Sequence, residues 1–251
     1  MPVRWNIFCG MSILLFSCFM PALVLAGTEP QVGQPSILVT GFEPFGGDTV
    51  NGSWEAVRHL EGQRIAGRRV LVRQLPVVWQ RASKELEALI RRYHPEAVVA
   101  FGVAGAEPVR VEMVAKNVLD MIRDNAGNLP ASRVIQPGAP SDLRTTLNST
   151  LIVRRLQEAA IPVTLSEDAG GYLCNETFFN LMNFTPSATS PLRYRGFIHV
   201  PPPGARVAMP DGSRFLFDRA ALEKAADVVL RAVAEGLQGE GASGQVQSIH
   251  H

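Results

Sequence analysis

Ala97-Val98-Val99-Ala100-Phe101 is a continuous apolar run that ends at Gly102. A strand that is apolar on both faces is typical of the centre of a parallel sheet that helices cover on each side. Four further short apolar runs are bounded by turn residues, and we expect strands there as well. They cover residues 36–40, 70–78, 162–165 and 196–200.

Segments with apolar residues at helical spacing separate these strands. Residues 81–93 show the pattern clearly, with Leu86, Leu89 and Ile90 on one face, and His94-Pro95 ends the segment. We expect other helices behind Ser53 as N-cap and at residues 147–159, 173–182 and 216–237. The alternation predicts an α/β protein: a single-domain three-layer α/β/α sandwich with a largely parallel twisted sheet.

Two segments depart from this alternation. Residues 109–118 alternate between apolar and polar side chains, which predicts a half-exposed strand. Residues 119–142 have few periodic signals, and a loop of that length in a compact domain is more often functional than idle.

The two ends of the chain differ from the domain between them. Residues 1–26 carry Arg4, an apolar run over 7–25 and the small-residue pattern Val24-Leu25-Ala26, which predicts a secretory signal peptide. We therefore expect an exported protein, periplasmic or secreted, with a linker at 27–35, a domain at 36–237 and a disordered tail at 238–251. Phe16 is bulky for a lipoprotein cleavage box, so we do not expect lipidation of Cys18.

Charge excludes some classes of partner. Removal of the signal peptide takes away one basic residue and no acidic residue, which leaves 23 basic side chains against 23 acidic ones. There is no basic run, so we expect no nucleic-acid partner, and the remaining chain has no stretch that predicts a membrane span.

Cys174 is the one cysteine that remains after the signal peptide. It follows Gly170-Gly171 and lies in the expected first turn of a helix, where unpaired N–H groups and the helix dipole favour a thiolate. A thiolate is the form that attacks a carbonyl, so Cys174 is a candidate nucleophile. The alternative is a buried small hydrophobic residue.

His199 is the best candidate for a base. It ends an expected strand just before Pro201-Pro202-Pro203, and ligands of open α/β sheets bind beyond the carboxyl ends of strands. The alternative is a hydrogen-bonded core histidine. The other histidines lie at the C-terminus, on an expected helix surface and at a helix end: His250, His251, His59 and His94.

Glu112 is the candidate that would orient the imidazole of His199, because such a site usually has a carboxylate or amide as third member. It lies on the polar side of the alternation in 109–118. The alternative is an ordinary surface glutamate.

The loop after the first strand reads Gly41-Phe42-Glu43-Pro44-Phe45-Gly46-Gly47. It has neither the Lys-Ser/Thr ending of a phosphate loop nor the dinucleotide glycine pattern. Two phenylalanines between glycines indicate instead a flat apolar slot for a small ring.

Four segments together resemble the type I pyroglutamyl peptidases, a family of cysteine peptidases also called pyrrolidone-carboxylate peptidases. They are residues 41–54, 112–117, 168–175 and 196–201, in the family's order. The resemblance implies an α/β/α enzyme that removes an N-terminal pyroglutamyl residue from peptides, without a cofactor or metal. It also implies roles for single residues: Cys174 as nucleophile, His199 as general base and acid, Glu112 as the orienting group, Phe42 and Phe45 beside the lactam ring, and Asn51 at the edge of that pocket.

The chain departs from the family pattern in several places. Gly105-Ala106-Glu107-Pro108 stands where members carry a Gly-Gly-Arg-like stretch, and Gly52 and Gly171 replace a proline and an arginine. Asp120-Met121-Ile122-Arg123-Asp124-Asn125 is shorter than the corresponding family segment, in which an arginine supports the oxyanion, so Arg123 is the nearest match.

Two functions are compatible with these residues. One is an exported cysteine exopeptidase whose partners are peptides with N-terminal pyroglutamate, and the other is an exported lactam- or peptide-binding homologue with weak or lost catalysis. Retention of Cys174, His199 and Glu112 together favours the enzyme, because a binding protein does not need all three. The residues leave the choice between monomer and homo-oligomer open.

Overall fold

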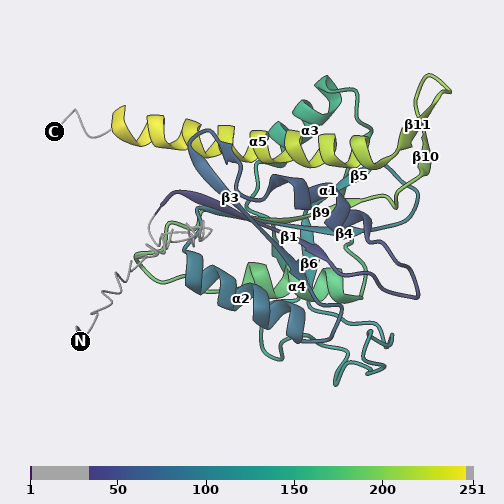
Figure 1. Ribbon diagram of the computed structural model, residues 1–251. Coiled ribbons are helices and arrows are strands. Elements are labelled where there is room, and N and C mark those ends of the chain that lie inside the picture. Colours follow the sequence, from purple (N-terminus) through teal and green to yellow (C-terminus); the bar gives the residue numbers. More distant parts are fainter. Residues whose placement is uncertain (2–33, 247–251) are drawn as a thin grey trace.

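A seven-stranded sheet forms the middle of the molecule (Figure 1). The computed structural model describes Met1 and residues 34–246. The expected signal peptide beyond Met1, nearly all of the linker and residues 247–251 of the tail lie outside this range. Within it, the sheet has the order β2-β3-β1-β4-β9-β5-β8. Its strands are β1 (Ser36–Phe42), β2 (Arg64–Ile65), β3 (Arg68–Leu75), β4 (Ala97–Val103), β5 (Val109–Glu112), β8 (Val163–Ser166) and β9 (Tyr194–Val200).

The sheet is mixed but mostly parallel. β1 pairs in parallel with β3 and β4, β4 with β9, and β5 with β8, whereas β2 runs antiparallel to β3, and β5 antiparallel to β9. The apolar run at 97–101 lies in the central strand β4, as predicted.

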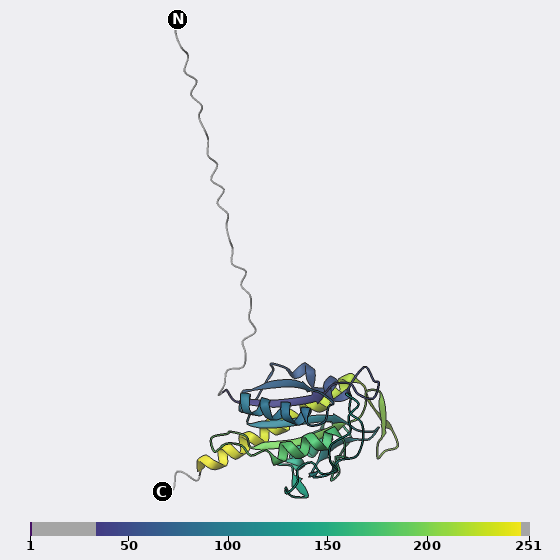
Figure 2. The same cartoon turned by 90° about the horizontal axis from the view of Figure 1, so that it is seen from below.

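Helices cover both faces of the sheet, so the predicted three-layer sandwich is confirmed (Figures 1 and 2). α1 (Gly52–Val57), α3 (Ser149–Glu158) and α5 (Arg219–Val246) lie on one face. α2 (Arg81–Tyr93) and α4 (Leu173–Asn183) pack side by side on the other. A 3-10 turn, η1 (Arg58–Leu60), follows α1.

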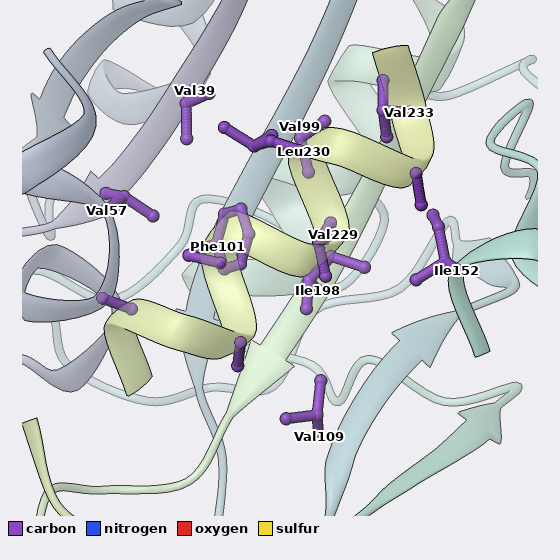
Figure 3. Close-up of a cluster of buried hydrophobic side chains, with 14 of the residues drawn as sticks. Val39, Val57, Val99, Phe101, Val109, Ile152, Ile198, Val229, Leu230 and Val233 are labelled. Carbon is purple, nitrogen blue, oxygen red and sulfur yellow. The ribbon is translucent and has the colours of Figure 1, made fainter. Parts of the chain in front are cut away.

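Alternation along the buried strands divides the core into two layers. Val99 and Phe101 of β4 face α5, and Figure 3 shows Val229 and Leu230 of α5 packed over them. Val98 and Ala100 of the same strand belong to the opposite layer, under α2 and α4.

The predicted strand at 109–118 is wrong in its extent. β5 ends at Glu112, and β6 (Val114–Lys116) pairs instead with β7 (Asp142–Arg144) in a separate two-stranded sheet. The chain turns away at Met113, whose N–H donates to Ser166 O at 2.7 Å. β5 lies between β9 and β8 with both faces covered, so it is buried rather than half-exposed.

The C-terminal prediction needs two corrections. Leu216 does not begin a helix, because it lies in β11 (Arg214–Phe217), which pairs with β10 (Ala205–Ala208) in a hairpin. α5 begins at Arg219 and continues to Val246, so residues 238–246 of the expected disordered tail are helical. No proline interrupts 219–246, and the glycines there weaken a helix without breaking it.

Within residues 34–246, no helix is both long and apolar enough to cross a membrane. The same residues contain no cluster of His, Cys, Asp and Glu side chains suited to hold a metal ion.

Candidate active site

A cavity of about 280 Å³ lies at the carboxyl ends of β1, β4 and β9, the edge of a parallel sheet where ligands usually bind. Its volume suits a small ligand, since pockets for drug-sized molecules are roughly 300–1,000 Å³. The structure brings six of the seven predicted site residues to it: Phe42, Phe45, Asn51, Cys174 and His199 line it, and Glu112 lies behind His199.

Cys174 is the second residue of α4, which begins at Leu173, as its position after two glycines predicted. Gly170 has φ of 80°, in the region that favours glycine, and it turns the chain into the helix. The thiol packs against Gly102 of β4, where a Cβ atom would come within 2.8 Å of Cys174 Sγ. The missing side chain at Gly102 therefore makes room for the sulfur.

His199 joins Cys174 to Glu112. Its Nδ1 lies 2.7 Å from Glu112 Oε1, and the two side chains are buried, with 3% and 0% of their surface exposed. Cys174 also lies close enough to His199 to act on the imidazole, and both residues line the cavity. Burial alone would lower the pKa of His199, but the negative charge of Cys174 and the hydrogen bonds to Cys174 and Glu112 raise it to about 9. The arrangement thus favours an imidazolium at neutral pH, next to the sulfur of Cys174.

Glu112 is not the surface residue that the alternation in 109–118 indicated. It is fully buried because β5 is an inner strand. Burial restricts the carboxylate to the partners in reach, and these are His199 and Arg110.

Arg110 is a site residue that the sequence analysis missed. It lines the cavity, and its Nε lies 3.1 Å from Glu112 Oε1 while its Nη2 lies 3.4 Å from His199 Nδ1. Residues two apart on a strand share a face. That relation to Glu112 is the signal that could have identified Arg110 once Glu112 was a candidate.

Aromatic rings form the apolar wall that the glycine-bounded loop predicted. Phe42 packs against Phe197 with ring centroids 6.4 Å apart, and Phe45 packs against Tyr172 at 6.2 Å. Tyr172, which directly precedes α4, is an aromatic lining residue that the sequence analysis did not single out.

Asn51, rather than Ser53, is the N-cap of α1. Its Oδ1 accepts the N–H of Ser53 at 2.9 Å, and its Nδ2 donates to Glu43 O at 3.0 Å. Ser53 instead uses its hydroxyl to accept the N–H of Phe42 at 3.0 Å. These bonds fix the end of β1 and with it the position of Phe42.

The long loop after β6 is held by buried and half-buried carboxylates. Glu43 Oε1 accepts Val77 N at 2.8 Å and Asn125 Nδ2 at 3.1 Å. Asp124 Oδ2 accepts Trp79 N at 3.0 Å. These bonds join residues 77–79 to residues 124–125 behind the Phe42–Phe45 loop. The loop at 119–142, which was predicted to be functional, therefore shapes the site indirectly.

The structure does not bring Arg123 to the cavity. Its Nη1 donates to Gly127 O at 2.6 Å, its side chain is exposed, and it is not among the residues that line the cavity. Only its backbone reaches the wall, because Arg123 O accepts the hydroxyl of Tyr172 at 3.0 Å.

Known proteins match this chain over most of its length. A family model described as pyroglutamyl peptidase matches residues 35–213. Pyrrolidone-carboxylate peptidase 1 of Ralstonia nicotianae is 43% identical over 171 residues, which cover 67% of this chain and 79% of the relative. Pyrrolidone-carboxylate peptidase of Klebsiella pneumoniae is 39% identical over 212 residues, 82% of this chain and 98% of the relative.

Solved structures give the same result. Pyroglutamyl peptidase I from Bacillus amyloliquefaciens matches with a TM-score of 0.70 and 31% identity over 80% of this chain and 98% of its own. Pyrrolidone carboxyl peptidase from Thermococcus litoralis matches with a TM-score of 0.72 and 32% identity over 82% and 96%. The chain therefore belongs to the pyroglutamyl peptidase family of cysteine peptidases.

Proposed function

We propose that this protein is a cysteine omega peptidase that hydrolyses the bond after an N-terminal pyroglutamyl residue. The observation that carries the proposal is the chain of contacts from Glu112 through His199 to Cys174 at the wall of a small, aromatic-lined cavity. A binding protein with lost catalysis would not need this buried chain, and no observation favours that alternative.

The reaction follows from the geometry. Cys174 Sγ attacks the carbonyl carbon of the pyroglutamyl residue, and His199 gives its proton to the leaving amine, which breaks the peptide bond and leaves a thioester. Water then attacks the thioester carbonyl while His199 takes a proton from it, and the C–S bond breaks. This step releases pyroglutamate and leaves the Cys174 sulfur beside protonated His199 for the next cycle. Glu112 accepts the Nδ1–H of His199, which directs Nε2 toward the reacting atoms.

Charge on the carbonyl oxygen develops near the N-terminus of α4. The first N–H groups of a helix have no partner inside the helix, and Cys174 lies among them. Such backbone donors stabilise an oxyanion. We assign this role to the first turn of α4, since the guanidinium of Arg123 is bound to Gly127 O.

Substrate recognition rests on the ring. A lactam has no free amine for an ordinary aminopeptidase to bind, so selection requires ring packing and hydrogen bonds to the ring amide. Phe42 and Phe45 supply apolar surface, and Asn51 contributes a fixed side-chain amide at the cavity wall.

The test is hydrolysis of a fluorogenic pyroglutamyl amide by the purified protein, with the prolyl and glutamyl amides as controls. We expect release from the pyroglutamyl substrate only, and loss of release in Cys174→Ala with the fold retained. Activity near wild type in Cys174→Ala would contradict the mechanism. Equal turnover of the prolyl amide would contradict the proposed specificity.

The sequence of residues 1–26 supports a further part of the proposal, export with cleavage after Ala26. The intact mass of protein from the periplasm or medium should correspond to a chain that starts at Gly27. A chain that starts at Met1 and occurs only in the cytosol would refute export. Light scattering of the same sample would decide between monomer and homo-oligomer.

A further inference from the structure

Arg110 is a charged side chain at the site that the proposed mechanism does not use. Only 22% of the side chain is exposed, and its contacts are with charged or catalytic groups. Besides the contacts to Glu112 and His199, its Nη1 lies 3.0 Å from Glu107 Oε2. Arg110 thus connects an exposed carboxylate at the edge of the site with the buried one.

Glu112 is shared between two partners. His199 Nδ1 and Arg110 Nε both approach Oε1, at 2.7 Å and 3.1 Å. Among the described residues, the second oxygen of Glu112 and the Nε of Arg110 have no hydrogen-bond partner, although both atoms are buried. The guanidinium therefore acts on Glu112 chiefly through its charge. A small rotation of either group would turn this ion pair into a hydrogen bond.

The charged groups that contact His199 lie on two elements, and further charges lie next to these. α4 supplies Cys174, and β5 supplies Glu112 and Arg110. The turn before β5 supplies Glu107, which faces Arg110 rather than His199. Asp168, in the segment before α4, feels the charge of Arg110 but is paired with Lys116 at 3.2 Å. Within residues 34–246, Arg110 is thus the positively charged side chain in contact with the Glu112–His199 pair.

We propose that Arg110 is a positioning residue for hydrolysis: it holds the Glu112 carboxylate toward His199 and, by its charge, limits how tightly His199 keeps its proton. The proposal rests on the proposed function. A cation beside an imidazolium disfavours the protonated form, whereas an unshared carboxylate would favour it. Without Arg110, His199 should therefore retain its proton to higher pH and give it up less readily to the leaving amine.

The test uses Arg110→Met, which keeps an unbranched stem and removes the charge, and Arg110→Lys, which keeps the charge. Arg68→Met is the matched control. Arg68 begins β3, away from the site, and its side chain is also mostly buried, with 12% exposed. Its Nε lies 2.7 Å from Glu96 Oε2, so this variant likewise removes a partly buried ion pair. The first readout is the pH profile of kcat/KM with the fluorogenic pyroglutamyl amide. The second is the pH dependence of iodoacetamide labelling of Cys174, followed on its tryptic peptide.

In Arg110→Met, we expect kcat/KM to begin its fall at alkaline pH about 0.5–1 pH unit higher than in the wild type. The change in the labelling rate at alkaline pH should shift upward by the same amount. We expect kcat to fall roughly 3- to 10-fold, since a tighter-held proton makes a weaker acid. Arg110→Lys should show a pH dependence close to that of the wild type. Arg68→Met should lower the melting temperature without changing the pH dependence of kcat/KM or of labelling.

The role of Arg110 would be overturned if Arg110→Met left the alkaline fall of kcat/KM and the alkaline change in labelling at the wild-type pH, or moved them to lower pH. The labelling readout does not require turnover. If the wild type fails to hydrolyse the pyroglutamyl amide, the proposed function falls, while a shifted labelling profile would still support the coupling of Arg110 to His199.

Discussion

Gly102→Ala tests whether the fold reserves space for Cys174, the proposed nucleophile. A Cβ atom at this position would lie 2.8 Å from Cys174 Sγ and 2.8 Å from the ring of Phe197, so one of these neighbours must move. Overpacking a core in this way costs about 1–3 kcal/mol of the free energy of unfolding. A shift of a reacting atom by about 1 Å can reduce turnover on the order of 100-fold. We therefore expect kcat for the pyroglutamyl amide to fall by about that factor, with a melting temperature lower by roughly 2–12 °C.

Gly196→Ala provides the matched control. Gly196 lies in the neighbouring strand β9, and its added Cβ would meet Thr145 and Leu147 instead of the thiol. It should lower the melting temperature at least as much as Gly102→Ala but leave kcat of the folded fraction near wild type. If Gly102→Ala retained wild-type kcat, or if both variants lost kcat in proportion to stability, the reasoning from space around Sγ would be refuted.

Four further predictions concern the site and its surroundings. His199→Ala should reduce kcat nearly as much as Cys174→Ala, and Glu112→Gln less, because orienting groups contribute less than the groups they orient; steady-state kinetics checks both. Phe45→Ala should raise KM with a smaller change in kcat, since ring packing acts in the ground and transition states alike. Arg123→Ala should leave kcat within about 3-fold of wild type, because its guanidinium binds Gly127 O; a loss of 100-fold would restore an oxyanion role. Burial raises the pKa of Glu176 from 4.5 to about 7, so the folded protein keeps a proton that the unfolded chain releases, and stability falls as pH rises through this range. Glu176→Gln should remove that fall and raise the free energy of unfolding at pH 8 by up to about 3 kcal/mol, measured by urea denaturation at pH 5 and 8.

The layered fold could be predicted because its strands and helices differ in period. The buried strands are continuous apolar runs, and the helix Arg81–Tyr93 begins and ends where its apolar face and His94-Pro95 indicate. The hairpin of β10 and β11 was missed because four-residue strands give too few alternations to stand out. The break at Met113 was missed for another reason. It depends on which strands lie beside the segment, a property of the whole sheet.

The proposed catalytic residues could be predicted from the sequence because each occupies a position with a local signal. Cys174 follows two glycines at a helix start, and His199 ends a strand before three prolines. Glu112 had a weaker signal and was given the wrong burial, because alternation cannot distinguish a polar face from a buried polar network. Only the pairing of β5 with β9 shows that Glu112 and His199 lie on neighbouring strands.

The two arginines show where local signals end. Arg123 matched a family motif by order in the chain, but the shorter segment places its guanidinium on Gly127 O, outside the cavity. Arg110 matched no motif, yet antiparallel pairing sets it directly opposite His199 in the register of β5 and β9. A long side chain at such a position can reach the ring nitrogen of its partner, and the 3.4 Å contact follows from that register. The charge environment of His199 is therefore set by strand pairing, and Arg110 is the arginine whose removal tests for an electrostatic effect on this site.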